Sequence, residues 1–258
     1  MKRTLQLLAG VALYAVWVAT AACSSDTATE TSGARVTLKT RVVANGVDAF
    51  TNDYGWTVNL SRALVSTGPL YYFEGAPLEA SWWGIRPAYA HPGHYQAGQT
   101  DGEMLTEWSV DLLAGPASLA DGNAVTGTVR SATFSFNPPT AGPVKDQLDG
   151  HVVLLEGMAQ KDDDSRLFRA VADEAEVLNA EGKPLVEGCP FESGAIGNSG
   201  TVTLTIDVPL WLDQVDFEQL VPSTNGEPVS FEPDSIVDKA FLRGLKKAAA
   251  YHFSYGAS

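Results

Sequence analysis

The stretch Val36-Thr-Leu-Lys-Thr-Arg-Val-Val43 alternates apolar and polar residues. A period of two is typical of a β-strand that buries one face. The same pattern predicts further strands at Gly55–Ser66, Leu70–Phe73, Thr106–Leu113, Thr126–Phe136, His151–Gln160, Leu167–Val177 and Thr201–Val208. Segments rich in Gly, Pro, Asn and Asp separate them and are expected to form turns. This number of short strands predicts a mainly β fold, an antiparallel β-sandwich.

One hairpin and one helix are expected within this sandwich. The strands at 151–160 and 167–177 are joined by a short polar turn, which favours a hairpin. The turn contains Asp162, Asp163 and Asp164, but these lack the spacing of a calcium-binding EF-hand loop, so we expect them to be solvated. Asp234 is the predicted cap of a C-terminal α-helix over residues 235–249, and a last strand is expected at 251–255.

The N-terminus has the pattern of an export signal. Lys2 and Arg3 precede an apolar stretch that ends in small residues before Cys23. We therefore assign residues 1–22 to a signal peptide, residues 23–34 to a flexible polar tether, and residues 35–258 to a single β-sandwich domain. The apolar stretch is short for a transmembrane helix, which needs roughly 20 residues.

The segment Thr20-Ala21-Ala22-Cys23 resembles the lipobox of bacterial lipoproteins. The resemblance implies that Cys23 is acylated, for example by palmitate, and that the protein is lipid-anchored in the cell envelope. Ser24 resembles the residue that directs such lipoproteins to the outer membrane, whereas periplasmic or surface exposure stays open. Thr20 replaces the usual Leu, so ordinary cleavage after Ala21 or Ala22 is the alternative; it would leave Cys23 as a thiol and make a disulfide with Cys189 conceivable. With Cys23 acylated, Cys189 is expected to be a buried core residue in a turn-like segment.

The charge of the chain excludes one class of partner. The 258 residues carry 17 Lys and Arg against 31 Asp and Glu, a net charge of −14. Such a chain is expected to repel both a phosphate backbone and an anionic lipid surface, so nucleic acid is not an expected partner. The expected partners are the membrane, through the lipid anchor, and a metal ion or an envelope protein.

Two of the four histidines lie in one motif, Ala90-His-Pro-Gly-His-Tyr95. The Pro-Gly turn can bring His91 and His94 to one side of a loop, where their imidazoles would bind a transition metal. Glu103 and Met104 are the nearest further candidate ligands in sequence, in a turn-like stretch that also offers Asp101 as an oxygen donor. A His/Met set favours copper, and a His/carboxylate set favours zinc or iron. His151 and His252 are expected to be ordinary strand residues.

Aromatic residues form a second candidate site. Seven of them fall between residues 71 and 95, namely Tyr71, Tyr72, Phe73, Trp82, Trp83, Tyr89 and Tyr95. Tyr71 and Phe73 alternate and are expected in the core. Adjacent Trp82 and Trp83 would point to opposite faces of an extended chain, so one of them is expected at the surface. The candidate residues for binding a glycan or a protein are Trp82, Trp83, Tyr89 and Tyr95.

Catalytic signatures are absent from the sequence: it has no G-x-S-x-G, no H-E-x-x-H, no P-loop and no dinucleotide-binding fingerprint. We therefore expect a non-enzymatic envelope lipoprotein that binds copper or zinc through the His-Pro-Gly-His loop. A glycan- or protein-binding module that uses the aromatic surface is the main alternative. A hydrolase built on carboxylates or on a catalytic zinc, with Glu103 as the candidate base, is a third. The metal-binding arrangement distantly resembles periplasmic copper-associated β-sandwich lipoproteins.

Overall fold

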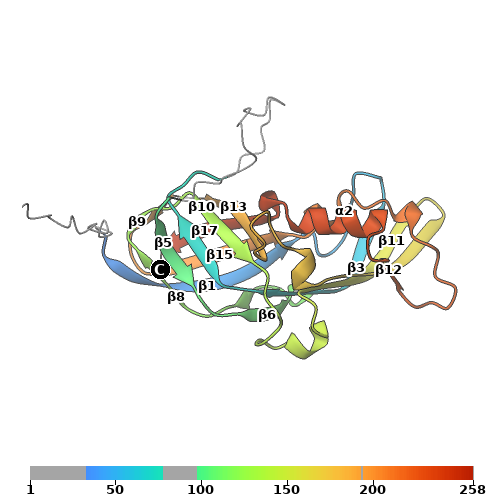
Figure 1. The fold of residues 1–258 in the computed structure, drawn as a ribbon, viewed down its shortest axis with the longest axis horizontal. Helices are drawn as coiled ribbons and strands as arrows, with labels where there is room; N and C mark the ends of the chain where they lie inside the picture. Colours follow the sequence, from blue (N-terminus) through green and yellow to red (C-terminus); the bar gives the residue numbers. More distant parts are fainter. Residues whose placement is uncertain (1–32, 78–97, 193, 258) are drawn as a thin grey trace, which may run out of the picture. The chain divides into compact units, whose positions relative to one another are not determined.

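The computed structural model describes residues 33–77, 98–192 and 194–257 (Figure 1). This part of the chain is mainly β, as predicted, and contains two α-helices. The described residues all belong to one compact unit, which begins at Gly33. The described core residues all lie between Val36 and Tyr255, so the unit carries its own core. None of the described helices is long and apolar enough to span a bilayer.

Eight strands form a closed barrel, and the structure differs here from the predicted sandwich. Their order around the barrel is β15 (Gly200–Asp207), β17 (Tyr251–Ala257), β13 (Leu185–Glu192), β10 (Ser131–Ser135), β4 (Leu70–Phe73), β5 (Thr100–Met104), β8 (Gly122–Val125) and β1 (Arg35–Asn45). Parallel pairing of β1 with β15, from Leu38 opposite Gly200 to Asn45 opposite Asp207, closes the ring. Alternation within one strand shows only that one face is buried, which sandwiches and barrels share.

A second sheet contains β16 (Val229–Ser230), β12 (Asp164–Ala172), β11 (Val153–Lys161), β3 (Thr57–Thr67) and β2 (Phe50–Thr51), with β6 (Trp108–Asp111) also paired to β3. The predicted hairpin is confirmed, since β11 and β12 pair from Val153 opposite Ala172 to Lys161 opposite Asp164. The remaining strands are short: β7 (Ala117–Ser118) pairs with β1, and β9 (Gly127–Thr128) pairs with β14 (Ala195–Ile196).

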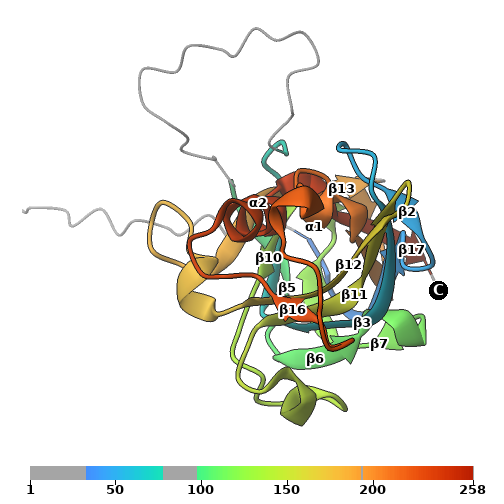
Figure 2. The same cartoon turned by 90° about the vertical axis from the view of Figure 1, so that its right-hand side faces the viewer.

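The two helices, α1 (Pro209–Leu212) and α2 (Ile236–Leu245), pack side by side (Figure 2). Short 3-10 turns occur at Leu112–Ala114, Lys145–Leu148, Glu174–Glu176, Phe217–Gln219 and Ala248–Ala250. The cap of α2 differs from the prediction, because Ser235 Oγ accepts the hydrogen bond from the Asp238 N–H. Asp234 has a φ of 65°, and its backbone N–H donates to Asp238 Oδ2.

Apolar side chains fill the barrel. Along β15, Val202, Leu204 and Ile206 are fully buried, and Phe134 and Tyr251 stack with ring centroids 4.1 Å apart. Cys189 is a buried free thiol, as predicted, and burial raises its pKa to about 12. It lies within strand β13, however, and not in a turn. The barrel is therefore a packed core whose binding chemistry must lie on its outer surface or at its ends.

Candidate functional site

The β4–β5 connection carries most of the residues that the sequence singles out. Its described ends are held together, because the Glu74 N–H donates to the Gln99 carbonyl oxygen over 3.3 Å. The connection contains most of the candidate residues, namely Trp82, Trp83, Tyr89, His91, His94 and Tyr95, and these lie outside the described residues. Cys23, near the N-terminus, also lies outside them. The structure describes the two strands that the connection joins, β4 and β5, and we call this region the foot of the connection.

The foot contains a β-bulge at Asp101. Phe73 pairs with Thr100 and Tyr72 pairs with Gly102, so Asp101 has no opposite residue on β4. The prediction of a turn at residues 101–104 is wrong, since these residues form most of β5. Bulges commonly redirect a side chain next to functional sites.

Asp101 is a buried carboxylate with spare bonding capacity. Only 4% of the residue is exposed, and its Oδ2 atom is buried without a hydrogen-bond partner among the described residues. Burial raises the pKa of this carboxyl group, and the negative charge of Glu74 raises it further. A buried carboxylate oxygen without a donor costs free energy unless a cation or a hydrogen-bond donor joins it.

A hollow of about 410 Å³ lies over this region, on the outer surface of β5, β8 and the start of β1. Its polar lining comes from Arg35, Thr100, Asp101, Glu103 and Asn123. Glu103 is half-buried there, between Tyr71 of β4 and Asn123 of β8. The structure therefore places Asp101 and Glu103 in the lining of one hollow. Glu74 lies close enough to Asp101 for its negative charge to add to the effect of burial on the Asp101 pKa.

Met104 does not share this surface. It is fully buried in the hydrophobic core, and neighbouring residues of a strand point to opposite faces. A Cβ placed on Gly122 would lie 3.3 Å from the Met104 Cβ atom, which shows how closely this side of the strand is packed. Glu103 and Met104 therefore point to opposite faces of β5, because residues 101–104 belong to a strand and not to a turn.

The aromatic residues of β4 are arranged in the opposite way to the prediction. Tyr72 is fully buried and packs edge-on against Phe191 and Phe253 inside the barrel. Tyr71 and Phe73, which were expected in the core, are half-buried. They flank Tyr72 in sequence, so the alternation of the strand directs them outward, toward the side on which Glu103 lies.

The two described histidines lie far from the bulge in the topology. His252 is on β17, which is four strands away from β5 in either direction around the eight-stranded barrel. It lines a different hollow with Asp207 and Glu192. His151 precedes β11 of the second sheet, and its Nδ1 atom lies 2.6 Å from Asp173 Oδ1. Neither histidine meets Asp101 or Glu103.

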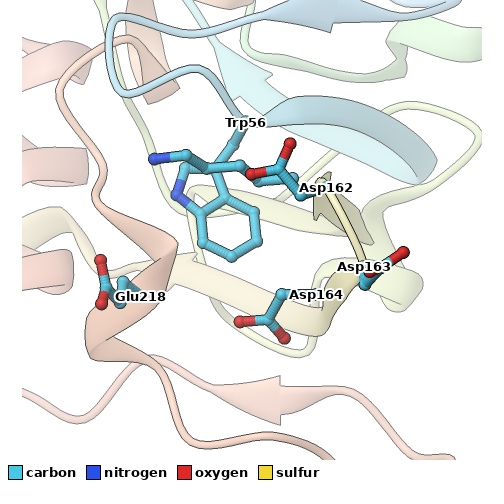
Figure 3. A pocket seen from close by; sticks show the side chains of 6 residues that line it. Trp56, Asp162, Asp163, Asp164 and Glu218 are labelled. Atoms are coloured by element: carbon cyan, nitrogen blue, oxygen red, sulfur yellow. The ribbon is translucent and has the colours of Figure 1, made fainter.

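A second acidic hollow lies at the tip of the β11–β12 hairpin. Figure 3 shows Trp56 between Glu218 on one side and Asp162, Asp163 and Asp164 on the other. Trp56 is only 2% exposed, so it offers little surface for a ligand to stack on. Asp164 forms an ion pair with Arg166, whose guanidinium also lies 5.9 Å from the Trp56 ring centroid. These interactions give the cluster a structural role at the hairpin tip.

Within residues 33–77, 98–192 and 194–257, no three His, Cys, Asp or Glu side chains converge as a ready metal site. A complete metal site at the bulge would need further ligands from outside the described residues, where His91 and His94 are the sequence candidates. Glu74 and Arg35 were not identified as site residues from the sequence. The only signal for Glu74 was its position directly after the aromatic strand Leu70–Phe73. Comparison with family models, with curated proteins and with solved structures finds no match to this chain.

Proposed function

We propose that this protein is an envelope-anchored lipoprotein that binds a transition metal at the foot of the β4–β5 connection, without catalysing a reaction. Asp101 carries the proposal: it is a buried carboxylate with one unpartnered oxygen, placed by a bulge beside Glu74 and Glu103. His91 and His94 of the same connection supply the nitrogen ligands. Acylation of Cys23 anchors the protein, and Ser24 favours the outer membrane.

The described geometry favours zinc over copper. Met104 lies in the core, which leaves a set of imidazoles and carboxylates. Imidazole and carboxylate ligands bind zinc readily, whereas a thioether would have favoured copper(I). The surroundings also favour a cation in this hollow: burial raises the pKa of Asp101, and the negative charge of Glu74 raises it further, so a bound cation would offset both effects.

Calorimetric titration with zinc and with copper tests this function. The protein is the chain from residue 23 with Cys23→Ser, so that the Cys23 thiol cannot compete for metal; the remaining thiol, Cys189, is buried. We expect one zinc per chain, and at least tenfold weaker binding after His91→Ala/His94→Ala. The matched control, His151→Ala/His252→Ala, removes the same number of imidazoles and should leave binding unchanged. No zinc binding by the folded protein, or equal losses in both double variants, would refute the proposal.

A recognition surface for a glycan or a protein is the second candidate. It is favoured by Tyr71 and Phe73, which the strand directs outward and which precede Trp82 and Trp83 in the sequence. This candidate predicts that Trp82→Ala/Trp83→Ala abolishes ligand capture while thermal unfolding and zinc binding stay unchanged. Array screening with envelope glycans, with and without added zinc, distinguishes the two functions.

A further inference from the structure

Strand β1 presents a row of basic side chains on the outer surface of the barrel. Arg35, Lys39 and Arg41 are all exposed, and they alternate with buried Leu38 and Thr40. The period of two therefore places the three cations on one face of one strand.

These cations are not used within the fold. No ion pair or side-chain hydrogen bond of the described residues involves any of the three, although Arg62, Arg166, Arg169, Lys183, Lys239 and Lys247 are all paired with carboxylates. Exposed basic side chains with no acidic partner remain free to interact with an external anion.

The residues that pair with them on neighbouring strands are uncharged. Opposite Arg35 is Val125, opposite Lys39 is Thr201, and opposite Arg41 are Thr203 on one side and Ser118 on the other. Between them, Thr37 pairs with Asn123. A row of cations with no acid directly opposite is notable in a chain with a net charge of −14. We call this surface, formed by Arg35, Lys39 and Arg41, the β1 basic face.

We infer that the β1 basic face docks on the anionic lipid headgroups of the membrane to which the protein is anchored. The inference rests on the lipid anchor of the proposed function, and it does not require a bound metal. Arg35 is twelve residues after Cys23, so a fully extended tether holds it within about 40 Å of the anchor. β1 is thus the first strand that the membrane can reach, and its charge is complementary to an anionic surface.

The net charge of the domain does not prevent this contact. Electrostatic forces between exposed charges are screened beyond about 8 Å at physiological salt, so the nearest side chains dominate. Each Lys or Arg near an anionic membrane strengthens binding by about fivefold. The acidic remainder of the surface is repelled, which orients the domain with the β1 basic face toward the lipid. Arg35 also lines the hollow of Asp101, so docking would hold that hollow next to the membrane.

Lysine footprinting on vesicles tests the docking. The chain from Cys23 is coupled through its Cys23 thiol to a maleimide lipid; buried Cys189, whose pKa is about 12, stays unmodified. The coupled protein is treated with a membrane-impermeant acetylating reagent on phosphatidylcholine vesicles, and on vesicles that also contain phosphatidylglycerol. Mass spectrometry then gives the acetylation rates of Lys39 and Lys145. We expect Lys39 to react several-fold more slowly on the anionic vesicles, and exposed Lys145 to react equally on both.

Two double variants complete the test, and both retain Lys39 so that its acetylation rate can still be measured. Arg35→Gln/Arg41→Gln should remove most of the protection, since it lowers the docking equilibrium constant by about 25-fold. The control Arg130→Gln/Arg243→Gln changes the net charge equally at two exposed positions and should retain it. Protection should also disappear in about 1 M salt. Equal Lys39 rates on both vesicles, or equal effects of both variants, would overturn the inference. Because the lipid is attached chemically, these results do not depend on acylation in the cell, which mass spectrometry of the native protein tests separately.

Discussion

Replacing Asp101 by Asn should separate binding from stability. The substitution keeps the size of the side chain but removes a charge on a residue that is only 4% exposed and close to Glu74. A buried polar atom without a partner costs about 1–3 kcal/mol and a charged one costs more, so replacing the carboxylate by a neutral amide removes only this excess. The hollow beside Asp101 admits some solvent, so we take the lower end and expect Asp101→Asn to stabilise the metal-free domain by about 1 kcal/mol. For a domain of this size that raises Tm by about 2–4 °C.

The assay is urea unfolding of the metal-free protein near neutral pH, followed by tryptophan fluorescence, together with zinc titration of the same samples. We expect the unfolding midpoint to rise and zinc affinity to fall at least tenfold. Glu103→Gln is the matched control, because Glu103 lines the same hollow but is half-buried and should leave the midpoint unchanged. Destabilisation of Asp101→Asn by about 1 kcal/mol or more would show that the carboxylate is a structural acceptor, and would refute the reasoning.

Three further substitutions test packing, ionisation and the place of Met104. Gly244→Ala should destabilise the domain by about 2 kcal/mol in urea unfolding, since its Cβ would lie 2.3 Å from the Trp211 carbonyl oxygen, whereas Gly197→Ala has open space and should be neutral. Asp207→Asn should stabilise the folded domain by about 0.5 kcal/mol near pH 7 and have no effect near pH 3. Burial raises the pKa of Asp207 in the folded state, so its ionisation at higher pH opposes folding, whereas at pH 3 the carboxyl group is protonated in both states. Met104→Leu should leave zinc affinity within twofold, because the sulfur lies in the core; a larger loss in calorimetry would contradict this placement.

Local sequence patterns were sufficient to predict the positions of strands in which apolar and polar residues alternate. β1, β4, β15 and the β11–β12 hairpin all follow the predicted segments to within a few residues. The closure of the barrel was not predictable in this way, because it depends on pairing between Leu38 and Gly200, which are far apart in sequence. A short-range pattern reports which face is buried but does not report the partner strand.

The missed strands contain residues that normally favour turns. β5 includes Asp101 and Gly102, and the glycine is needed because a Cβ there would lie 2.7 Å from the Tyr72 ring. β13 includes Cys189 followed by a proline, a pattern that is typical of a turn. Tertiary packing overrides local propensity in both strands.

The candidate site was also predicted only where local sequence information was sufficient. Glu103 and Asp101 were identified by their proximity in sequence to His91 and His94, and the structure places both carboxylates at one hollow. Met104 was included by the same proximity, but strand geometry sends it to the core. The bulge that gives Asp101 its buried, unpartnered oxygen has no signature in the sequence, since it depends on the register between β4 and β5.

The coordination sphere of bound zinc tests the proposed metal site most directly. X-ray absorption spectroscopy of the zinc-loaded chain from residue 23 with Cys23→Ser reports the donor atoms and their distances. We predict nitrogen and oxygen donors at about 2.0–2.1 Å with the multiple-scattering pattern of two imidazoles, and no sulfur shell near about 2.3 Å. A sulfur shell, or a sphere of oxygen donors without imidazole, would contradict a site made by His91, His94 and Asp101.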